Sequence, residues 1–144
     1  MLSVYPACFF KEEQGYSVVF PDLGAATQGE DLQDAMNMAI DLLAGWIYDA
    51  WRENEEVPNP SNIEQIDLVQ VWDVEELGPV PEGSFVSMVS VDVKDYAKRV
   101  FEKKVNIKVT IPKWLKDYGI EKNINFSLVL TNALKQELGL EDVK

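Results

Sequence analysis

The stretch KVNIKVTIPKWLKDYGIEKNINFSLVLTNALKQEL, residues 104–138, decides how the end of the chain folds. Its first residues alternate between apolar and polar side chains. The apolar members are Val105, Ile107, Val109 and Ile111, and the polar members between them are Asn106, Lys108 and Thr110. A period of two predicts a β-strand with one covered face. Pro112 ends this strand, and we expect a short amphipathic helix, a break at Gly119 and a second helix to follow.

A strand with a basic polar face, followed by two helices, is the plan of a ribbon-helix-helix unit. A single strand cannot fill the DNA major groove, but two chains that pair their strands antiparallel form a ribbon that can. We therefore predict that residues 102–144 form a DNA-binding and dimerisation domain. The apolar side chains of the strand would lie in the dimer core. Asn106, Lys108 and Thr110 would contact base edges, where Asn favours adenine and Lys favours guanine.

The start of the second helix is expected to hold a DNA phosphate. Asn125 is of the residue type preferred at a helix N-cap. The backbone N–H groups of Phe126 and Ser127 would then be available to a phosphate, and Lys104 would add another phosphate contact. The apolar face of this helix consists of Leu128, Val129, Ala133, Leu134 and Leu138. One alternative stays open: a basic edge strand and a helical hairpin that pack on the first part of the chain, since lysine on an edge strand prevents aggregation.

The first 101 residues predict a separate α+β domain. Apolar residues at three- and four-residue spacing indicate a long helix at residues 31–54, and Pro58 and Pro60 stop it. The strands that we expect are residues 3–10, 16–20, 25–28, 66–72 and 85–93. Glycine and proline predict a loop over residues 73–84, and the spacing of residues 93–101 predicts a second helix. A small sheet with a long helix is therefore expected for residues 1–101.

Charge divides the chain in a similar place. The net charge is −12 over 144 residues. Residues 1–93 contain two basic and eighteen acidic residues, a net charge of −16, whereas residues 94–144 contain eleven basic and seven acidic residues, a net charge of +4. An acidic body repels nucleic acid and attracts a basic protein, and a basic region does the reverse. The two parts of the chain are therefore expected to have different partners.

Little in the composition favours catalysis. The chain has no histidine, so it lacks the commonest general base and metal ligand. Its single cysteine, Cys8, cannot form an internal disulfide, which fits a reducing cytoplasm, and is expected to be a small buried apolar residue. Neither a signal peptide nor an apolar run long enough to span a membrane is apparent. We expect a cytoplasmic binding protein without catalytic residues, metal or cofactor, although an acidic metal site remains an alternative.

Several motifs of the first part occur in one order: Tyr-Pro-Ala, a Gly-Tyr hairpin, Phe-Pro-Asp-Leu, Thr-x-Gly, an acidic residue and an Ala-rich helix. The residues concerned are Tyr5, Pro6, Gly15, Phe20, Pro21, Asp22, Leu23, Thr27 and Gly29. This pattern resembles that of the HicB antitoxins. The segment NFSLVLTNALKQEL, residues 125–138, resembles the last helix of HicB proteins that end in a ribbon-helix-helix domain.

The resemblance implies a partial ribonuclease-H-like domain without its catalytic set, at residues 1–101. Such a domain would bind and mask a small basic ribonuclease toxin of the HicA type, while the C-terminal ribbon represses the operon of both genes. The acidic charge of the first part independently suits a basic partner. Asp22, Glu30 and Asp31 are the candidate toxin contacts because they lie near the shared motif. The expected partners are the toxin, operator DNA and a second copy of the chain; a higher-order assembly with toxin is left open, and no membrane is involved.

Two other functions remain open at this point. A transcription regulator could share the DNA-binding ribbon and use its acidic domain for a different partner or ligand; a neighbouring gene that encodes no small basic protein would favour it. A nuclease that retained acidic metal chemistry would instead have magnesium-dependent activity, which a change at Asp22 would abolish.

Overall fold

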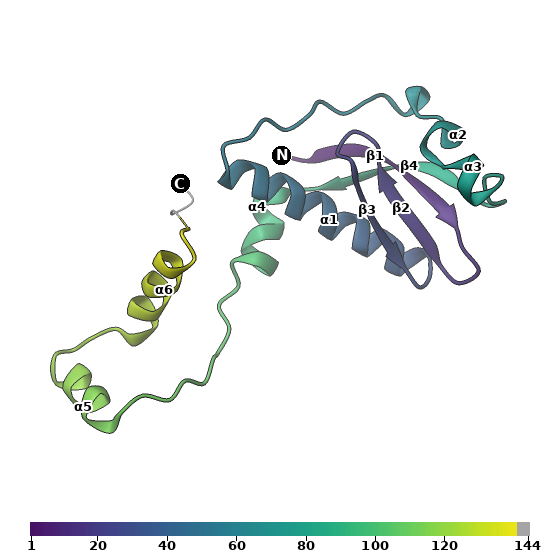
Figure 1. Cartoon of the computed structure of the whole chain (residues 1–144). Coiled ribbons are helices and arrows are strands. Elements are labelled where there is room, and N and C mark those ends of the chain that lie inside the picture. The colour runs from purple at the N-terminus through teal and green to yellow at the C-terminus, as the bar shows by residue number, and fades with distance from the viewer. Residues whose placement is uncertain (141–144) are drawn as a thin grey trace. The chain divides into compact units, whose positions relative to one another are not determined.

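The computed structural model of the chain describes residues 1–140, which divide into two units. Unit 1 is Met1–Lys103, and unit 2 begins at Lys104. The last four residues of the domain predicted at residues 102–144 lie outside the described residues. Figure 1 shows that unit 1 contains every strand of the described chain and that unit 2 contributes helices.

An antiparallel sheet forms the centre of unit 1, with the strand order β3-β2-β1-β4. Its strands are β1 (Ser3–Lys11), β2 (Tyr16–Phe20), β3 (Ala25–Gly29) and β4 (Phe85–Val91). Gly15 makes the β1–β2 turn with a φ of +81°, in the left-handed region that favours glycine. A Cβ at Gly15 would also stand 1.9 Å from the carbonyl oxygen of Gly29, so this glycine is needed for space as well. The strands predicted at residues 3–10, 16–20 and 25–28 are confirmed within one residue at each end, and the strand predicted at residues 85–93 is confirmed as β4, which ends two residues earlier, at Val91.

Helix α1 (Leu32–Arg52) covers one face of this sheet (Figure 1). Its buried side is made largely of small residues: Ala35, Ala39, Leu43, Ala44, Ile47 and Ala50. The helix start lies so close to the sheet that a Cβ at Gly29 would stand 2.2 Å from the backbone nitrogen of Ala35. The glycine of the Thr-x-Gly motif therefore permits the helix to pack on β3. Together the helix and the sheet enclose a core centred on Phe9, Phe20 and Leu43.

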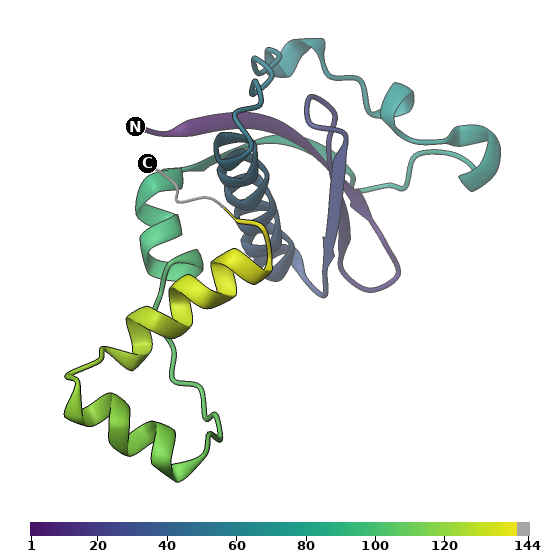
Figure 2. The same ribbon diagram turned by 60° about the vertical axis from the view of Figure 1, so that its left-hand side comes forward.

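The segment between α1 and β4 passes to the other face of the sheet (Figure 2). It contains three short helices: η1 (Ile63–Gln65), α2 (Leu68–Val71) and α3 (Val74–Leu77). The ring of Trp72 packs on that of Phe10, with centroids 4.7 Å apart, and so helps to bury the second face of β1.

The prediction of a strand at residues 66–72 is wrong, because α2 occupies this stretch. Its β-prone residues are overruled by a local cap, in which the carboxylate of Asp67 accepts a hydrogen bond from the backbone N–H of Val69. The loop predicted at residues 73–84 likewise contains α3, since Asp73 accepts from the N–H of Glu76. Both helices are single turns whose starts are fixed by an aspartate.

Unit 1 ends in α4 (Val93–Tyr96) and a single π-helical turn, η2 (Ala97–Phe101), which together match the helix predicted at residues 93–101. Both lie beside α1 (Figure 2). The hydroxyl of Tyr96 donates to Asp41 at 2.8 Å, and that of Tyr48 donates to Glu102 at 3.1 Å. These contacts fix the last helical segment of unit 1 on its longest helix.

Unit 2 contains α5 (Lys113–Glu121) and α6 (Phe126–Glu137). The predicted break at Gly119 is wrong, because α5 continues through it and ends before Asn123, which has a φ of +56°. Gly119 instead makes room for a ring: a Cβ there would stand 2.7 Å from Cζ of Phe126. Asn125 is confirmed as the N-cap of α6, since its side chain accepts from the N–H of Leu128 at 3.1 Å.

The strand predicted over residues 104–112 is not a strand in the single chain. Residues 103–112 have no regular secondary structure. The physical reason is that a β-strand exists only through hydrogen bonds to a neighbouring strand, and the described sheet lies within unit 1. The alternation of the sequence is real, but nothing in the described chain pairs with this segment.

Candidate functional site

Unit 2 exposes the apolar side chains that would normally form a core. None of residues 104–140 is buried. The exposed fractions are 79% for Val105, 67% for Ile107 and 57% for Val109. Large apolar residues of both helices are exposed as well, among them Trp114, Leu115, Leu128, Val129, Leu134 and Leu138. Exposed apolar surface on this scale marks an interaction surface.

The residues proposed for base contact lie on one segment without regular secondary structure. Asn106, Lys108 and Thr110 are all exposed and alternate with the apolar residues. In an extended chain successive side chains point to opposite sides, so this segment, when extended, has one polar edge and one apolar edge. Lys104, the first residue of unit 2, is exposed too. The segment can therefore present a polar edge to a partner while its apolar edge is covered by another protein surface.

The start of α6 is arranged as the sequence predicts. Because the Asn125 side chain caps the N–H of Leu128, the helix begins cleanly at Phe126. The N–H groups of Phe126 and Ser127 lie in the first turn, where no intrahelical acceptor exists. The Phe126 ring meanwhile lies against Gly119, which ties the end of α5 to the start of α6. This geometry allows an anion to be held at the helix start.

Asp22 has an internal role in unit 1. Its carboxylate accepts two hydrogen bonds from Ser61, one from the backbone N–H at 2.9 Å and one from the hydroxyl at 2.6 Å. The hydroxyl of Tyr5 donates to the nearby carbonyl oxygen of Pro58. Burial, and then the charge of Asp22, raise the pKa of Tyr5 above its ordinary value. Tyr5 and Asp22 thus fasten the chain that leaves α1 to the sheet.

Glu30 and Asp31 lie where β3 passes into α1. Asp31 is the N-cap of α1, because its carboxylate accepts from the N–H of Asp34 at 2.7 Å. Asp34 in turn accepts from the N–H of Glu30 at 2.9 Å. The carboxylate of Glu30 is exposed and forms no ion pair with any of residues 1–140. The structure therefore separates the three candidates: Asp22 and Asp31 have structural partners, and Glu30 is available to a ligand.

Helices α2 and α3 form a surface of acidic and apolar residues that the sequence analysis did not predict. Its apolar members are Val69 and Leu77, each 58% exposed, with Val74 beside them. Glu75 and Glu76 are exposed on α3, and neither forms an ion pair within residues 1–140. A shallow hollow lined by residues 69–75 joins the two helices. The sequence contains these acidic and apolar residues close together. Because a strand followed by a loop was predicted there, their common surface was not recognised. We call this surface the α2–α3 surface.

Metal binding and thiol reactivity depend on how the acidic and cysteine side chains of residues 1–140 are placed. Among residues 1–140, no three acidic or cysteine side chains are grouped so that they could hold a metal ion. Cys8 is buried in β1, and burial raises the pKa of its thiol to about 11. Such a thiol stays protonated and unreactive at neutral pH. None of the helices within residues 1–140 is long and apolar enough to cross a membrane.

Comparison with known proteins places this architecture. The family described as HicB-like antitoxin of bacterial toxin–antitoxin systems matches residues 5–125. A solved structure described as a toxin–antitoxin complex from Streptococcus pneumoniae contains a chain that is 34% identical, with a TM-score of 0.64; the match covers 95% of this chain and 99% of that one. Antitoxin HicB 1 of Photorhabdus laumondii is 41% identical over 61 residues, which are 42% of this chain and 39% of that protein. This chain therefore spans less than half the length of that curated relative.

Proposed function

Because the chain belongs to the HicB-like antitoxin family of bacterial toxin–antitoxin systems, we propose that it masks a small basic HicA-type ribonuclease with unit 1 and represses its own operon with unit 2. The observation that carries this proposal is the division of charge and burial between the units. Unit 1 has a closed core and most of the acidic residues, whereas unit 2 has exposed apolar residues and a polar edge with lysines. The role is that of a binding protein and not of an enzyme.

Unit 1 suits a basic partner by its charge. Residues 1–93 contain eighteen acidic residues and only two basic ones. Complementary charge speeds association and excludes partners of the wrong sign. A ribonuclease must bind a polyanion and is therefore basic around its active site, so an acidic protein can occupy the same surface. We propose that the sheet and α1 form a partial ribonuclease-H-like fold used for this binding.

Two places on unit 1 are proposed to meet the toxin. The first is the junction of β3 and α1, where Glu30 offers a carboxylate; Asp22 and Asp31 can add negative potential, but their oxygens already have partners. The second is the α2–α3 surface, where acidic and apolar residues adjoin. Interfaces combine an apolar centre with a polar rim, and this surface has both.

The toxin-binding proposal is tested by co-expressing the full chain with the small basic protein encoded next to its gene. A stable complex and restored growth are expected. For the α2–α3 surface, Glu75→Lys with Glu76→Lys should weaken the complex at least tenfold. Glu55→Lys with Glu56→Lys is the matched control, since it makes the same charge change at exposed positions between α1 and η1. Equal weakening by both pairs would mean that only net charge matters, and no complex with the wild type would remove the proposal.

For unit 2 we propose a ribbon-helix-helix dimer. Two chains would pair residues 104–112 antiparallel, which would bury Ile107, Val109 and Ile111 on the helices. Asn106, Lys108 and Thr110 would then face base edges in the major groove. Lys104 and the first turn of α6, with Asn125, Phe126 and Ser127, would hold phosphates on either side. The exposed apolar edge supports this arrangement, because a second copy would remove it from water.

Repression is tested by measuring binding to the DNA upstream of its own gene and to a scrambled duplex of equal length. Preference for the upstream DNA is expected, together with dimers in solution. If the chain prefers its own upstream DNA but binds no neighbouring basic protein, it is a regulator with a different partner for unit 1. If it binds neither duplex at low salt, the proposal that unit 2 binds DNA is wrong.

A further inference from the structure

The outward side of α4 and η2 carries a cluster of cations. Val93 and Ala97 are buried, and Tyr96 bonds to Asp41 of α1, so this side of the segment faces the body of unit 1. Residues 94, 95, 98 and 99 are exposed. Positions four apart lie on the same side of a helix, which aligns Lys94 with Lys98 and Asp95 with its partner Arg99. We call this side, with the adjoining Lys103, the basic face.

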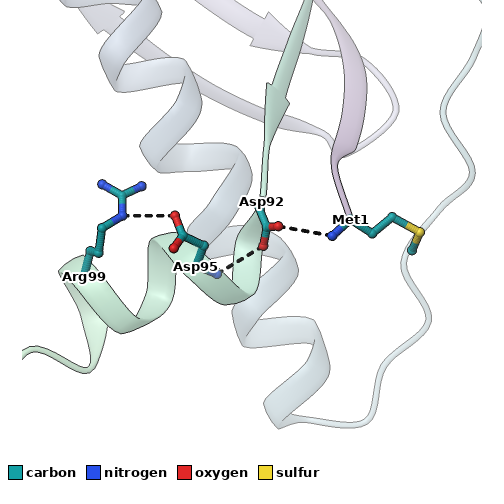
Figure 3. Close-up of polar contacts among 4 residues, drawn as sticks. All are labelled: Met1, Asp92, Asp95 and Arg99. Carbon is teal, nitrogen blue, oxygen red and sulfur yellow. Dashed lines mark hydrogen bonds and ion pairs between the residues drawn. The ribbon is translucent and has the colours of Figure 1, made fainter.

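The carboxylates near the basic face already have partners (Figure 3). Asp95 accepts from Nε of Arg99 at 3.1 Å, and Asp92 accepts both from the N–H of Asp95 and from the Met1 ammonium group, each at 3.1 Å. These bonds from Asp95 and Met1 lower the pKa of Asp92, so it remains ionised as the cap of α4. Lys94 and Lys98 form no ion pair with any of residues 1–140. The basic face therefore keeps an excess of positive charge.

This excess is unusual for unit 1. Residues 1–93 contain only Lys11 and Arg52 as basic residues, against eighteen acidic ones. The other four basic residues of unit 1 all lie within residues 94–103. Crowded like charges repel one another, and a polyanion that binds them removes the repulsion. The cations of unit 1 are therefore concentrated in the ten residues that adjoin unit 2.

Chain continuity limits how far the basic face can lie from the DNA-reading segment. Arg99 is five residues before Lys104, and a fully extended chain spans at most about 3.6 Å per residue, or about 18 Å here. Phosphates follow one another about 3.4 Å apart along the axis of each DNA strand. If residues 104–112 lie in the major groove, Arg99 lies at most this distance from Lys104, so an orientation of unit 1 that turns the basic face toward the flanking phosphates brings Lys103 and Arg99 within reach of them.

We propose that Lys94, Lys98, Arg99 and Lys103 bind DNA phosphates beside the groove occupied by residues 104–112. This inference rests on the proposed DNA binding of unit 2 and extends the footprint to a face of unit 1. Contacts with phosphate supply affinity and salt dependence but carry no sequence information. The basic face would thus hold the acidic unit 1 close to a polyanion that its other surfaces repel.

The test measures DNA affinity of the full chain over a series of salt concentrations by fluorescence anisotropy. Lys94→Gln with Lys98→Gln is compared with Lys11→Gln and Arg52→Gln, which removes the same charge from unit 1. Gln has a helix propensity close to that of Lys, and Arg99 keeps its pair with Asp95, so α4 should stay folded. The probes are the duplex upstream of the gene and a scrambled duplex.

We expect the slope of log affinity against log salt to become shallower by about 0.9 per lost contact, which is about 1.8 for the two contacts of one protomer and about 3.6 for a dimer whose protomers both touch the DNA. Affinity for both duplexes should fall by the same factor, and the control pair should keep the wild-type slope. A slope equal to that of the control pair overturns the inference. So does a loss of affinity for the basic partner protein with DNA binding unchanged.

The failure of this inference can be told apart from that of the proposed function. If Lys108→Ala loses the preference for upstream DNA while the Lys94 and Lys98 variant keeps its salt slope, unit 2 reads DNA and the basic face does not touch it. If the wild type binds neither duplex, DNA binding by unit 2 and the phosphate contacts of the basic face are both wrong.

Discussion

Unit 1 and unit 2 are both rich in apolar residues, but they use them differently. Unit 1 buries Phe9, Val18 and Phe20 completely between its sheet and α1, whereas none of residues 104–140 of unit 2 is buried. Burial of apolar area is the main stabilising contribution to folding. Unit 1 therefore has the means to fold within one chain, and the dimer proposed for unit 2 would cover its apolar surface.

The largest effect is expected in the core of unit 1. Phe20→Ala should lower the free energy of unfolding of unit 1 by about 3–5 kcal/mol, because it leaves a cavity under α1. Urea unfolding followed by tryptophan fluorescence measures this loss, which should not depend on protein concentration. Val105→Ala, at a position 79% exposed, is the control and should leave unit 1 unchanged. A cost below about 1 kcal/mol for Phe20→Ala would contradict a closed core.

The second-largest effect is expected on dimer formation by unit 2, with the stability of unit 1 unchanged. Val109→Lys should convert a dimer into a monomer, because it places a charge in the apolar interface expected between two copies, which costs several kcal/mol. Sedimentation velocity at micromolar concentration measures the change. The unfolding midpoint of unit 1 should stay the same. Met38→Lys, at an exposed apolar position of α1, is the matched control and should leave the dimer intact. Dimers that persist in the Val109 variant would show that unit 2 is covered in another way.

Cysteine reactivity gives a further contrast. Burial raises the pKa of Cys8 to about 11 from an ordinary 9.0, so at pH 8 its thiolate population is about a hundredfold smaller than that of an ordinary thiol. Alkylation of Cys8 should therefore be at least that much slower than alkylation of a cysteine placed at Val105 in a Cys8→Ala background. Above pH 9 the folded state should lose stability, because the unfolded chain releases the thiol proton first. Rapid labelling of Cys8 in the native protein would contradict its burial.

At the edge proposed to read DNA, Lys108→Ala should weaken binding to upstream DNA by about 1–3 kcal/mol, the value of one good base contact. Binding to the scrambled duplex should change much less. Lys122→Ala, an exposed cation at the end of α5, is the control. Anisotropy titrations of both variants at one salt concentration are sufficient. Equal losses for the two duplexes would make Lys108 a phosphate contact.

The helix caps give the smallest effects. Asp31→Ala and Asn125→Ala each remove a side chain that caps a first-turn N–H, at a cost of about 0.5–2 kcal/mol. The loss in unit 1 should be independent of protein concentration, whereas the loss in unit 2 should appear as weaker dimers. Unfolding curves at two concentrations distinguish the two cases. The same concentration dependence for both variants would contradict the prediction that only unit 2 is stabilised by dimerisation.

The sequence predicted the parts of unit 1 that depend on local periodicity. The strand at residues 16–20 and the long helix appear as β2 and α1, because alternation and helical spacing reflect burial on one face. It failed at residues 66–72, where the N-cap at Asp67 outweighed β-prone residues. Such capping is local, so an aspartate before four apolar or amide residues was a usable signal. Gly119 was misleading because glycine can serve close packing as well as helix termination.

Roles that depend on distant contacts could not be predicted. Asp22 lies in a motif shared with a family, which suggested a ligand contact, but its partner Ser61 is 39 residues away. The α2–α3 surface likewise depends on where the segment after α1 crosses the sheet. For residues 104–112, the alternation predicted which edge is apolar, but strand formation depends on hydrogen bonds that this chain alone does not supply.

We propose that toxin masking belongs to unit 1 and DNA reading to a dimer of unit 2. Growth rescue and repression of the upstream promoter can be measured in the same cells, which express the neighbouring basic protein together with the wild type or Val109→Lys. We expect the variant to rescue growth like the wild type while repression is lost. Loss of both activities, or of neither, would contradict the division of function between the two units.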